Sequence, residues 1–265
     1  MKKLQLSLFL SLISISIFSQ MRIIDPQNQW WDSYASIENV HIEVVPAGIF
    51  CETAITFDVK TSYSNFDNET QLEYIYDFYM PDDVVFNDSW LWIEDYISKG
   101  EIYEQSEGTA IYEAIVDRRQ DPSILTKYQN GSYNFRIYPL FADSTRKVRL
   151  SYLVPFDNNS TSFESTLPLS FLHDSYEKPQ NVTLDISDDL NWFHTPVSTS
   201  EWTKTNVENN ITTYTLKEEA TLTNQKVTFS PDVQEQYTLG IYEENDEKYF
   251  QLIYDPEIDY IATPS

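Results

Sequence analysis

Apolar residues recur at every second position through most of the chain. Aromatic and β-branched side chains supply the majority of them, and polar residues stand between them. Such residues on a period of two are typical of strands with one buried face. The alternating runs are 40–44, 55–59, 72–80, 133–137, 148–152, 182–186, 214–216, 227–229 and 239–241. The pattern therefore predicts a mainly β fold.

One dipeptide marks a tight turn. Asn130 and Gly131 separate the runs 124–128 and 132–138. A type I′ turn requires a positive φ at both central residues, which asparagine and glycine tolerate. We expect these two runs to form a β-hairpin.

The stretch 102–119 departs from the two-residue period. Ile111, Ala114 and Ile115 fall three and four positions apart, which places a narrow apolar stripe along one side of a helix. Pro122 prevents that helix from continuing. We expect one short helix that docks on the sheet by its Ile111 and Ala114 side, with Tyr112 also buried.

The first twenty residues have the pattern of a secretory signal peptide. Lys2 and Lys3 precede the apolar stretch 4–18, and Ser19 offers a small residue for cleavage. The stretch is shorter than the about 20 apolar residues that span a bilayer. We expect residues 1–19 to be removed and the protein to be exported to the periplasm, the cell surface or the medium. An uncleaved N-terminal anchor is the alternative.

Composition narrows the classes of function. The 17 basic and 42 acidic residues give a net charge of −25, which disfavours nucleic-acid binding because a phosphate backbone needs a basic patch. The five glycines are scattered, whereas nucleotide-binding loops and the nucleophile elbow need clustered glycines. Cys51 is the only cysteine, so no internal disulfide can form, and we interpret it as a small buried hydrophobe.

No motif predicts a metal or cofactor site. His41, His173 and His194 lie far apart in sequence, without the close spacing of a zinc-binding helix. The acidic clusters lack EF-hand spacing, so we interpret them as solvated turns and leave weak calcium binding open. These clusters lie at 82–83, 188–189 and 243–247. We assign no catalytic, cofactor-binding or metal-binding residue.

Seven short blocks follow one another in the order of a known family. Among them, residues 110–115 read AIYEAI and residues 118–125 read RRQDPSIL. The others are 72–82, 90–93, 100–102, 135–140 and 146–152. Together the blocks resemble the VIT domain of vault proteins and inter-alpha-trypsin inhibitor heavy chains, in a bacterial-type member. Gly108 stands where that family usually has alanine.

The resemblance implies an antiparallel β-sandwich or barrel-like domain with one docked α-helix, followed by a second all-β extension. We divide the chain into a signal peptide (1–19), a lead-in (20–35), the VIT domain (36–157) and the extension (158–265). The polar run 157–162 is expected to form a linker or long loop.

In many family members a segment like residues 249–256 leads into a von Willebrand factor A domain. The Asp-x-Ser-x-Ser metal motif of that domain does not occur in this sequence. We expect a member without that domain. The other interpretation, that the chain is the N-terminal part of a longer surface protein, stays open.

The blocks supply the candidate residues for interaction or for a structural signature. They are Trp90, Trp92, Tyr112, Arg118, Arg119, Asp121 and Pro122. The two tryptophans would share one strand face, where they pack or form a platform for sugars. The two arginines end the predicted helix, where positive charge complements the helix dipole and helps hold the following loop.

The resulting hypothesis is a non-enzymatic, exported VIT-domain protein that serves protein–protein interaction, adhesion or scaffolding. The resemblance implies a protein or extracellular-matrix partner and no established catalytic residues. A glycan-binding β module is the alternative, suggested by the acidic, aromatic-rich surface. A glycosidase built on an unrecognised pair of carboxylates is a third hypothesis.

Overall fold

The structure is a computed structural model, and it describes thirteen stretches of the chain. They are residues 21–28, 32–47, 50–62, 66–129, 131–142, 144–155, 157–159, 162–167, 169–187, 193–194, 201–231, 237–244 and 247–254. The predicted signal peptide and the Trp30-Trp31 pair of the lead-in lie outside these ranges. Within them, no helix is long and apolar enough to cross a membrane.

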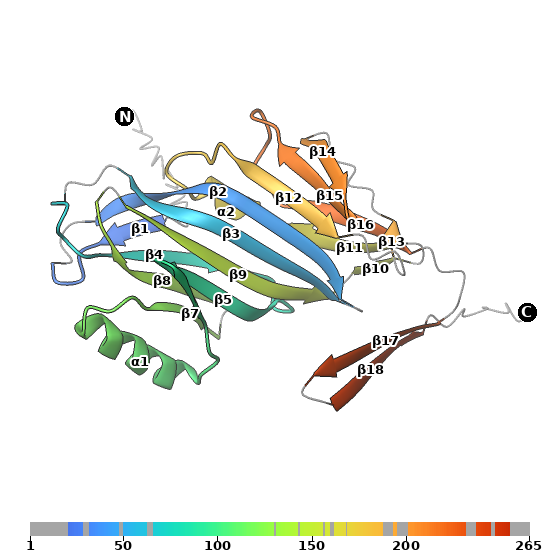
Figure 1. Ribbon diagram of the computed structural model, residues 1–265, viewed down its shortest axis with the longest axis horizontal. Coiled ribbons are helices and arrows are strands. Elements are labelled where there is room, and N and C mark those ends of the chain that lie inside the picture. The colour runs from blue at the N-terminus through green and yellow to red at the C-terminus, as the bar shows by residue number, and fades with distance from the viewer. Residues whose placement is uncertain are drawn as a thin grey trace, which may run out of the picture.

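Most of the molecule is one curled, half-barrel sheet of twelve strands (Figure 1). Its main path has the order β6-β5-β9-β3-β2-β1-β4-β8-β7, and neighbours along it pair in antiparallel fashion. The strands of the path are β1 (Met21–Ile24), β2 (Asp32–Ala47), β3 (Phe50–Ser62), β4 (Leu72–Tyr79), β5 (Val85–Ile93), β6 (Tyr96–Lys99), β7 (Ser123–Lys127), β8 (Ser132–Leu140) and β9 (Thr145–Pro155). The predicted mainly β, antiparallel fold is confirmed.

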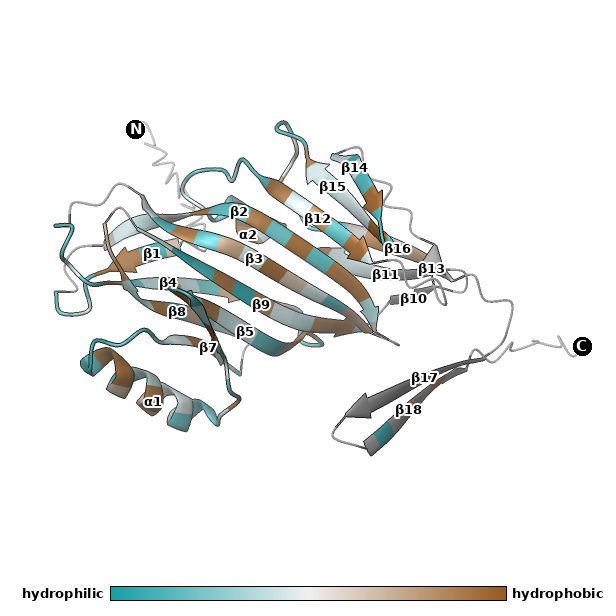
Figure 2. Cartoon of the chain, in the orientation of Figure 1, coloured by the Kyte–Doolittle hydropathy of each residue, from teal (hydrophilic) through white to brown (hydrophobic). Residues whose placement is uncertain are grey.

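The alternating apolar residues face the interior, as the sequence predicts. Val40, Ile42 and Val44 of β2 are each at most 1% exposed. Figure 2 shows the same alternation of brown and teal along β2 and β3. Aromatic rings make up much of the core, namely Phe57, Tyr74, Tyr76, Phe78, Tyr133, Phe135 and Tyr152, and the partly buried Phe86 packs against them. Their burial supplies much of the driving force for folding.

The predicted hairpin joins β7 to β8. Its strands pair from Lys127 opposite Tyr133 to Ser123 opposite Ile137. Gly131 has a φ of +77°, a region that side chains other than glycine rarely occupy, and its N–H donates to the Tyr128 carbonyl at 3.2 Å. Asn130 lies outside the described residues.

The predicted helix is α1 (Gln105–Asp117), but the side on which it docks differs from the prediction. Tyr112 is buried at 2% exposure, whereas Ile111 is 37% exposed and Ala114 lies in solvent. The docking side runs through Gly108, Tyr112 and the half-buried Ile115, at spacings of four and three. The expectation for Ile111 and Ala114 is therefore wrong. The physical reason is that Tyr112 has a buried polar partner on the sheet, described below, and orients the helix.

The extension adds further strands to the same sheet. β12 (Val182–Ser187) pairs in parallel with β2, and β15 (Ile211–Leu216) and β14 (Trp202–Glu208) continue from it. A second sheet consists of β10 (Asp157–Asn159), β11 (Ser162–Leu167), β16 (Gln225–Pro231) and β13 (Phe193–His194). The hairpin of β17 (Tyr237–Glu244) and β18 (Glu247–Tyr254) is a separate two-stranded sheet. The short helix α2 (Ser170–His173) follows β11.

Composition predicts a loop for the polar run 157–162, but residues 157–159 and 162 belong to strands, and residues 160–161 lie outside the described residues. Asp157–Asn159 forms β10 and pairs with β11, with Asn158 opposite Phe163. Backbone hydrogen bonds to β11 satisfy this segment despite its polar side chains. The domain boundary at residue 157 stays a prediction.

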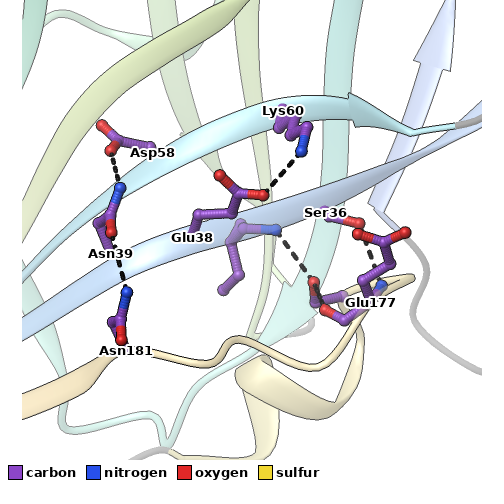
Figure 3. A network of polar contacts seen from close by, with 9 residues as sticks. Ser36, Glu38, Asn39, Asp58, Lys60, Glu177 and Asn181 are labelled. Carbon is purple, nitrogen blue, oxygen red and sulfur yellow. Dashed lines mark hydrogen bonds and ion pairs between the residues drawn. The ribbon is translucent and has the colours of Figure 1, made fainter.

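A polar junction fastens the extension to the first strands (Figure 3). A bulge interrupts the β2–β3 pairing between Glu38 and His41, and Asn39 within it has a φ of +50°. The Asn39 amide donates to Asp58 at 2.8 Å, and the Asn181 amide reaches Asn39 at 3.5 Å. Nearby, the backbone N–H groups of two residues donate to serine hydroxyls: Glu177 to Ser36 and Ile37 to Ser175, each at 3.0 Å. These bonds hold the loop before β12 against β2.

Candidate interaction surface

The two candidate tryptophans share the outer face of β5, as predicted. The ring centroids of Trp90 and Trp92 lie 5.8 Å apart. Three cations lie over these rings: the Lys99 amine at 4.6 Å and the Arg149 guanidinium at 5.0 Å from Trp90, and the Lys147 amine at 5.1 Å from Trp92. We call these five residues the tryptophan face.

Two carboxylates orient the tryptophan face. Asp88 accepts a hydrogen bond of 2.5 Å from the indole nitrogen of Trp90. Glu43 of β2 forms an ion pair with Arg149. Because register brings Trp90 opposite Arg149 across β5 and β9, the arginine lies between the indole and Glu43. Each contact between a cation and an aromatic ring contributes about 0.5–1 kcal/mol at an exposed site, which helps hold both side chains in place.

Tyr112, the third candidate, belongs to a buried polar cluster beneath α1. Its hydroxyl donates to the Glu73 carboxylate of β4 at 2.6 Å. The guanidinium of Arg136, on β8, lies 4.4 Å from the Tyr112 ring and bridges Glu73 at 3.5 Å and Glu113 at 2.8 Å. Burial raises the pKa of Glu73, an effect that the hydrogen bond from Tyr112 and the charge of Arg136 oppose.

The remaining candidates shape the end of α1. The Arg118 side chain donates to the Ala114 carbonyl at 2.9 Å and so caps the last turn, while Arg119 adopts a φ of +55° that ends the helix. It is Asp121 that fastens the following loop, through an ion pair of 2.9 Å with Arg146. Pro122 is buried, and its carbonyl accepts from the Tyr138 N–H at 3.0 Å. The four residues have structural partners, and the structure does not bring them to the tryptophan face.

A groove of about 580 Å³ lies between α1, β5, the segment 98–105 and β7. We call it the α1 groove. The rings of Phe86 and Tyr133 form its base, with centroids 4.9 Å apart, and both belong to or pack against the core. Glu73 does not line the α1 groove.

A second hollow of about 410 Å³ lies where β4 and β9 meet α2. Tyr76 donates to Asp174 there at 2.8 Å. Deeper in the core, Cys51 is fully buried, and burial raises the pKa of its thiol to about 11. The interpretation of Cys51 as a buried small residue is confirmed.

The histidines do not converge in the described part of the chain. The His41 imidazole contacts the Thr183 hydroxyl at 2.9 Å and Asp185 at 3.5 Å, between β2 and β12. Among the residues that the structure describes, no three His, Cys, Asp or Glu side chains are arranged to hold a metal ion. Asp188 and Asp189 lie outside them.

Sequence reasoning missed the partners of the candidate residues. Strand register brings Lys99 of β6 and Arg149 of β9 beside Trp90 of β5. It likewise brings Arg136 of β8 beside β4, which carries Glu73, the partner of Tyr112. The alternation of charged and apolar residues along 145–152 was the one available signal, because it places Lys147 and Arg149 on the face opposite the core.

Comparison with solved structures finds similarity to leukotriene A4 hydrolase from Saccharomyces cerevisiae (8% identity, TM-score 0.41) and to an M1 zinc metallopeptidase from Deinococcus radiodurans (10% identity, TM-score 0.36). Each match covers 82% of this chain, which spans only 31% and 47% of those two chains. No curated protein sequence matches.

The curled antiparallel sheet with one docked helix, whose outer face carries two tryptophans and three cations, defines a mainly β domain. The family model for the vault protein inter-alpha-trypsin domain matches residues 37–152. Residues 37–152 form a VIT domain, which confirms the resemblance noted in the sequence.

Proposed function

We propose that this protein is a non-enzymatic interaction module, exported from the cell, that binds a protein partner in adhesion or scaffolding. VIT domains are protein-interaction modules. The observation that carries the proposal is the tryptophan face. It gathers Lys99, Lys147 and Arg149 around two indoles in a chain whose net charge is −25.

The chemistry of the tryptophan face favours a protein partner. Tryptophan and arginine are the residues most enriched at the energetic centres of protein interfaces. Local positive charge on an acidic chain attracts carboxylates of a partner. The expected partner therefore presents acidic side chains beside an apolar patch.

A sugar partner is less well supported. Stacking of a sugar requires an open indole face, whereas Trp90 has two cations within 5.0 Å of its ring centroid and Trp92 has one at 5.1 Å. Binding a glycan there would require those cations to move. The glycan-binding alternative is therefore an outcome that the experiment below must distinguish.

The non-enzymatic assignment is supported by the surroundings of Glu73. This carboxyl has a perturbed pKa, which is a common property of catalytic groups. It is, however, 6% exposed, engaged by Tyr112 and Arg136, and absent from the lining of the α1 groove. A structural role accounts for the raised pKa.

Zero-length cross-linking tests the proposal. Carbodiimide joins lysine amines to carboxylates, so intact producing cells are treated with it, and products of Lys99 and Lys147 are identified by mass spectrometry. We expect one partner protein whose cross-links disappear in Trp90→Ala/Trp92→Ala. Tyr79→Ala, which removes an aromatic that is 73% exposed on β4, is the matched control and should retain them.

Three results would count against the proposal. Cross-links that persist unchanged in the double tryptophan variant would remove the tryptophan face from partner binding. Turnover of a chromogenic sugar or peptide substrate, abolished by one point mutation, would contradict the non-enzymatic assignment. Selective binding to a glycan array, lost in Trp90→Ala, would establish the glycan-binding alternative instead.

Export is tested separately by intact mass. The protein recovered from the medium or the cell surface should be about 2 kDa lighter than the full chain if residues 1–19 are cleaved. Full-length protein that stays with the membrane fraction would support the uncleaved anchor.

A further inference from the structure

The two edges of the curled sheet approach one another at the α1 groove without pairing. β7 is the last strand on one edge of the sheet path, and the described chain places no strand on its outer side. On the other edge, β6 covers only Trp90–Ile93 of β5. Residues 85–88 of β5 therefore pair with β9 alone among the described strands. Both of these free edges line the same groove.

Side chains close the barrel where the backbone does not. Phe86 of β5 packs against Tyr133 of β8, with ring centroids 4.9 Å apart, and the Tyr133 hydroxyl donates to the Val84 carbonyl at 3.4 Å. These contacts seal the core there, while the outer edges of β7 and of residues 85–88 have no strand partner among the described residues. Exposed strand edges are templates for pairing with another extended chain.

The walls of the groove expose apolar side chains. Ile102 is 87% exposed, Val85 55%, Tyr103 46% and Ile111 37%, and all four line the groove. Proteins usually blunt a free edge with lysine, proline or a covering helix. Here α1 packs beside β7 through Gly108, whose position would place a Cβ 3.9 Å from the Ile124 side chain, and the groove itself stays open.

We propose that the α1 groove binds an extended peptide segment of a partner protein by β-strand addition. The segment pairs its backbone with the free edge of β7 or of residues 85–88, and places alternate apolar side chains on Phe86 and Tyr133. Strand addition derives affinity from main-chain hydrogen bonds and specificity from alternate side chains. This goes beyond the function proposed above, because it assigns a second surface and the conformation of its ligand.

The charged residues that line the groove indicate the charge of the peptide that it binds. The groove is lined by four carboxylates, Asp88, Glu101, Glu104 and Asp121, and by two amines, Lys99 and Lys127. With the chain at −25, the field favours a segment that carries lysine or arginine at its polar positions. It also disfavours a second copy of this chain as the occupant.

Arrayed octapeptides test the proposal on the full mature chain. One series alternates Val or Ile with Lys, and a second replaces Lys by Glu. A third keeps the Lys sequences but carries N-methyl groups on alternate backbone amides, which removes donors on one edge of the peptide. We expect binding in the Lys series, with at least tenfold weaker binding in each of the other two.

Protein variants locate the site. Ile111→Lys adds a charge inside the groove and should weaken the best Lys peptide at least tenfold, while Val207→Lys adds the same charge on exposed β14 and should not. Glu101→Lys/Glu104→Lys should reduce the difference in binding affinity between the Lys peptides and the Glu peptides. The matched double change Glu218→Lys/Glu219→Lys, in an exposed turn, should leave that difference in affinity unchanged.

Hydrogen exchange provides the readout specific to strand addition. Bound peptide should slow amide exchange at 85–88 or 123–127. Absence of binding in every series, equal binding of the Lys and Glu series, or equal binding of the N-methylated series would overturn the proposal. So would a concentration-dependent dimer, seen by sedimentation, that protects the same amides without peptide. Neither Trp90 nor Trp92 lines the groove, so Trp90→Ala/Trp92→Ala should leave this assay unaffected, and the two proposals can fail independently.

Discussion

The Tyr112 hydroxyl donates a 2.6 Å hydrogen bond to the carboxylate of Glu73, which joins α1 to β4 across 39 positions of sequence. Arg136 lies against the same tyrosine ring and bridges both Glu73 and Glu113. Hydrogen bonding of Tyr112 to Glu73, together with the contact of Arg136 with the Tyr112 ring, thus holds the helix on the sheet. The apolar residues Ile111 and Ala114 of the helix remain exposed. A polar attachment fixes orientation more narrowly than apolar contact does, because hydrogen bonds are directional.

Truncation of Tyr112 should be costly. Tyr112→Ala removes a buried aromatic ring and should lower the free energy of unfolding by about 3–5 kcal/mol. Tyr112→Phe keeps the ring but leaves the Glu73 carboxylate without its hydroxyl donor, so a smaller loss of about 1–3 kcal/mol is expected. Urea denaturation followed by tryptophan fluorescence measures both. A melting temperature unchanged by Tyr112→Ala would contradict the docking described here.

The pH dependence of stability should report on Glu73. Its pKa is raised in the folded state, chiefly by burial, so the folded protein holds this proton more tightly than the unfolded chain. The contribution of Glu73 to stability is then greatest below the ordinary glutamate pKa of about 4.3 and declines as pH rises through the raised value. Glu73→Gln cannot ionise, so its stability relative to the parent should improve between pH 4 and pH 7.

Glu113→Gln is the matched control for that measurement. Glu113 also pairs with Arg136 but is exposed, so its substitution should leave the slope between pH 4 and pH 7 largely intact. A Glu73→Gln profile that parallels the parent would mean that Glu73 titrates as an ordinary surface carboxyl.

Periodicity predicted the strands because one buried face imposes a period of two wherever a sheet covers a core. The same reasoning failed at α1. Ile111, Ala114 and Ile115 form the apolar stripe, yet the docking residue is Tyr112, and its partner Glu73 is a charged residue in an otherwise apolar strand. Local pattern contains no information on a pair separated by 39 positions. The tryptophan face shows the same limit, since Trp90 was recognised and Arg149 became its neighbour only through strand register.

The prediction of a loop at residues 157–162 failed for a different reason. Its polar side chains are typical of loops, but a strand on the second sheet needs only its backbone to pair, as β10 does with β11. Side-chain composition predicts such a strand poorly because side chains contribute little to its pairing.

Cys51 should be inert in the folded protein. Burial raises the pKa of its thiol from an ordinary 9.0 to about 11, so very little thiolate exists near neutral pH, and the side chain is inaccessible. Iodoacetamide should label the protein only above the urea midpoint. Because the folded pKa of this acid is raised, its contribution to stability should fall as pH increases from about 9 to 11, by roughly 2 kcal/mol. Cys51→Ala should lack that decline, and rapid labelling of the native protein would contradict the burial.

Two glycines should respond to alanine in opposite directions. Gly108 is in α1, where a Cβ would meet Tyr103 at 3.5 Å and Ile124 at 3.9 Å, both ordinary contacts. Gly108→Ala should therefore stabilise the protein by up to about 1 kcal/mol through helix propensity. Gly131 has a φ of +77°, and its Cβ would lie 3.0 Å from Asp82, so Gly131→Ala should cost about 1–2 kcal/mol. Thermal melts of the two variants should move to opposite sides of the parent.

The tryptophan face should show measurable coupling between Trp90 and Lys99. The Lys99 amine lies 4.6 Å from the Trp90 ring centroid on the neighbouring strand β6, a geometry that contributes about 0.5–1 kcal/mol when exposed. A double-mutant cycle with Trp90→Leu and Lys99→Met, followed by urea denaturation, should yield a coupling energy of that size. The charge-preserving Lys99→Arg should retain most of it, because guanidinium also binds aromatic faces.

The same cycle run with Trp90 and Lys127 is its control, since Lys127 lies instead over Tyr133 and should show no coupling to Trp90. Coupling that vanishes for Trp90 and Lys99 as well would mean that the amine is solvated rather than held over the indole. In that case Arg149 would be the one remaining cation over the Trp90 ring among those described, and the argument against a sugar partner would be weaker. The cycle therefore tests one premise of the preference for a protein partner over a sugar before either has been identified.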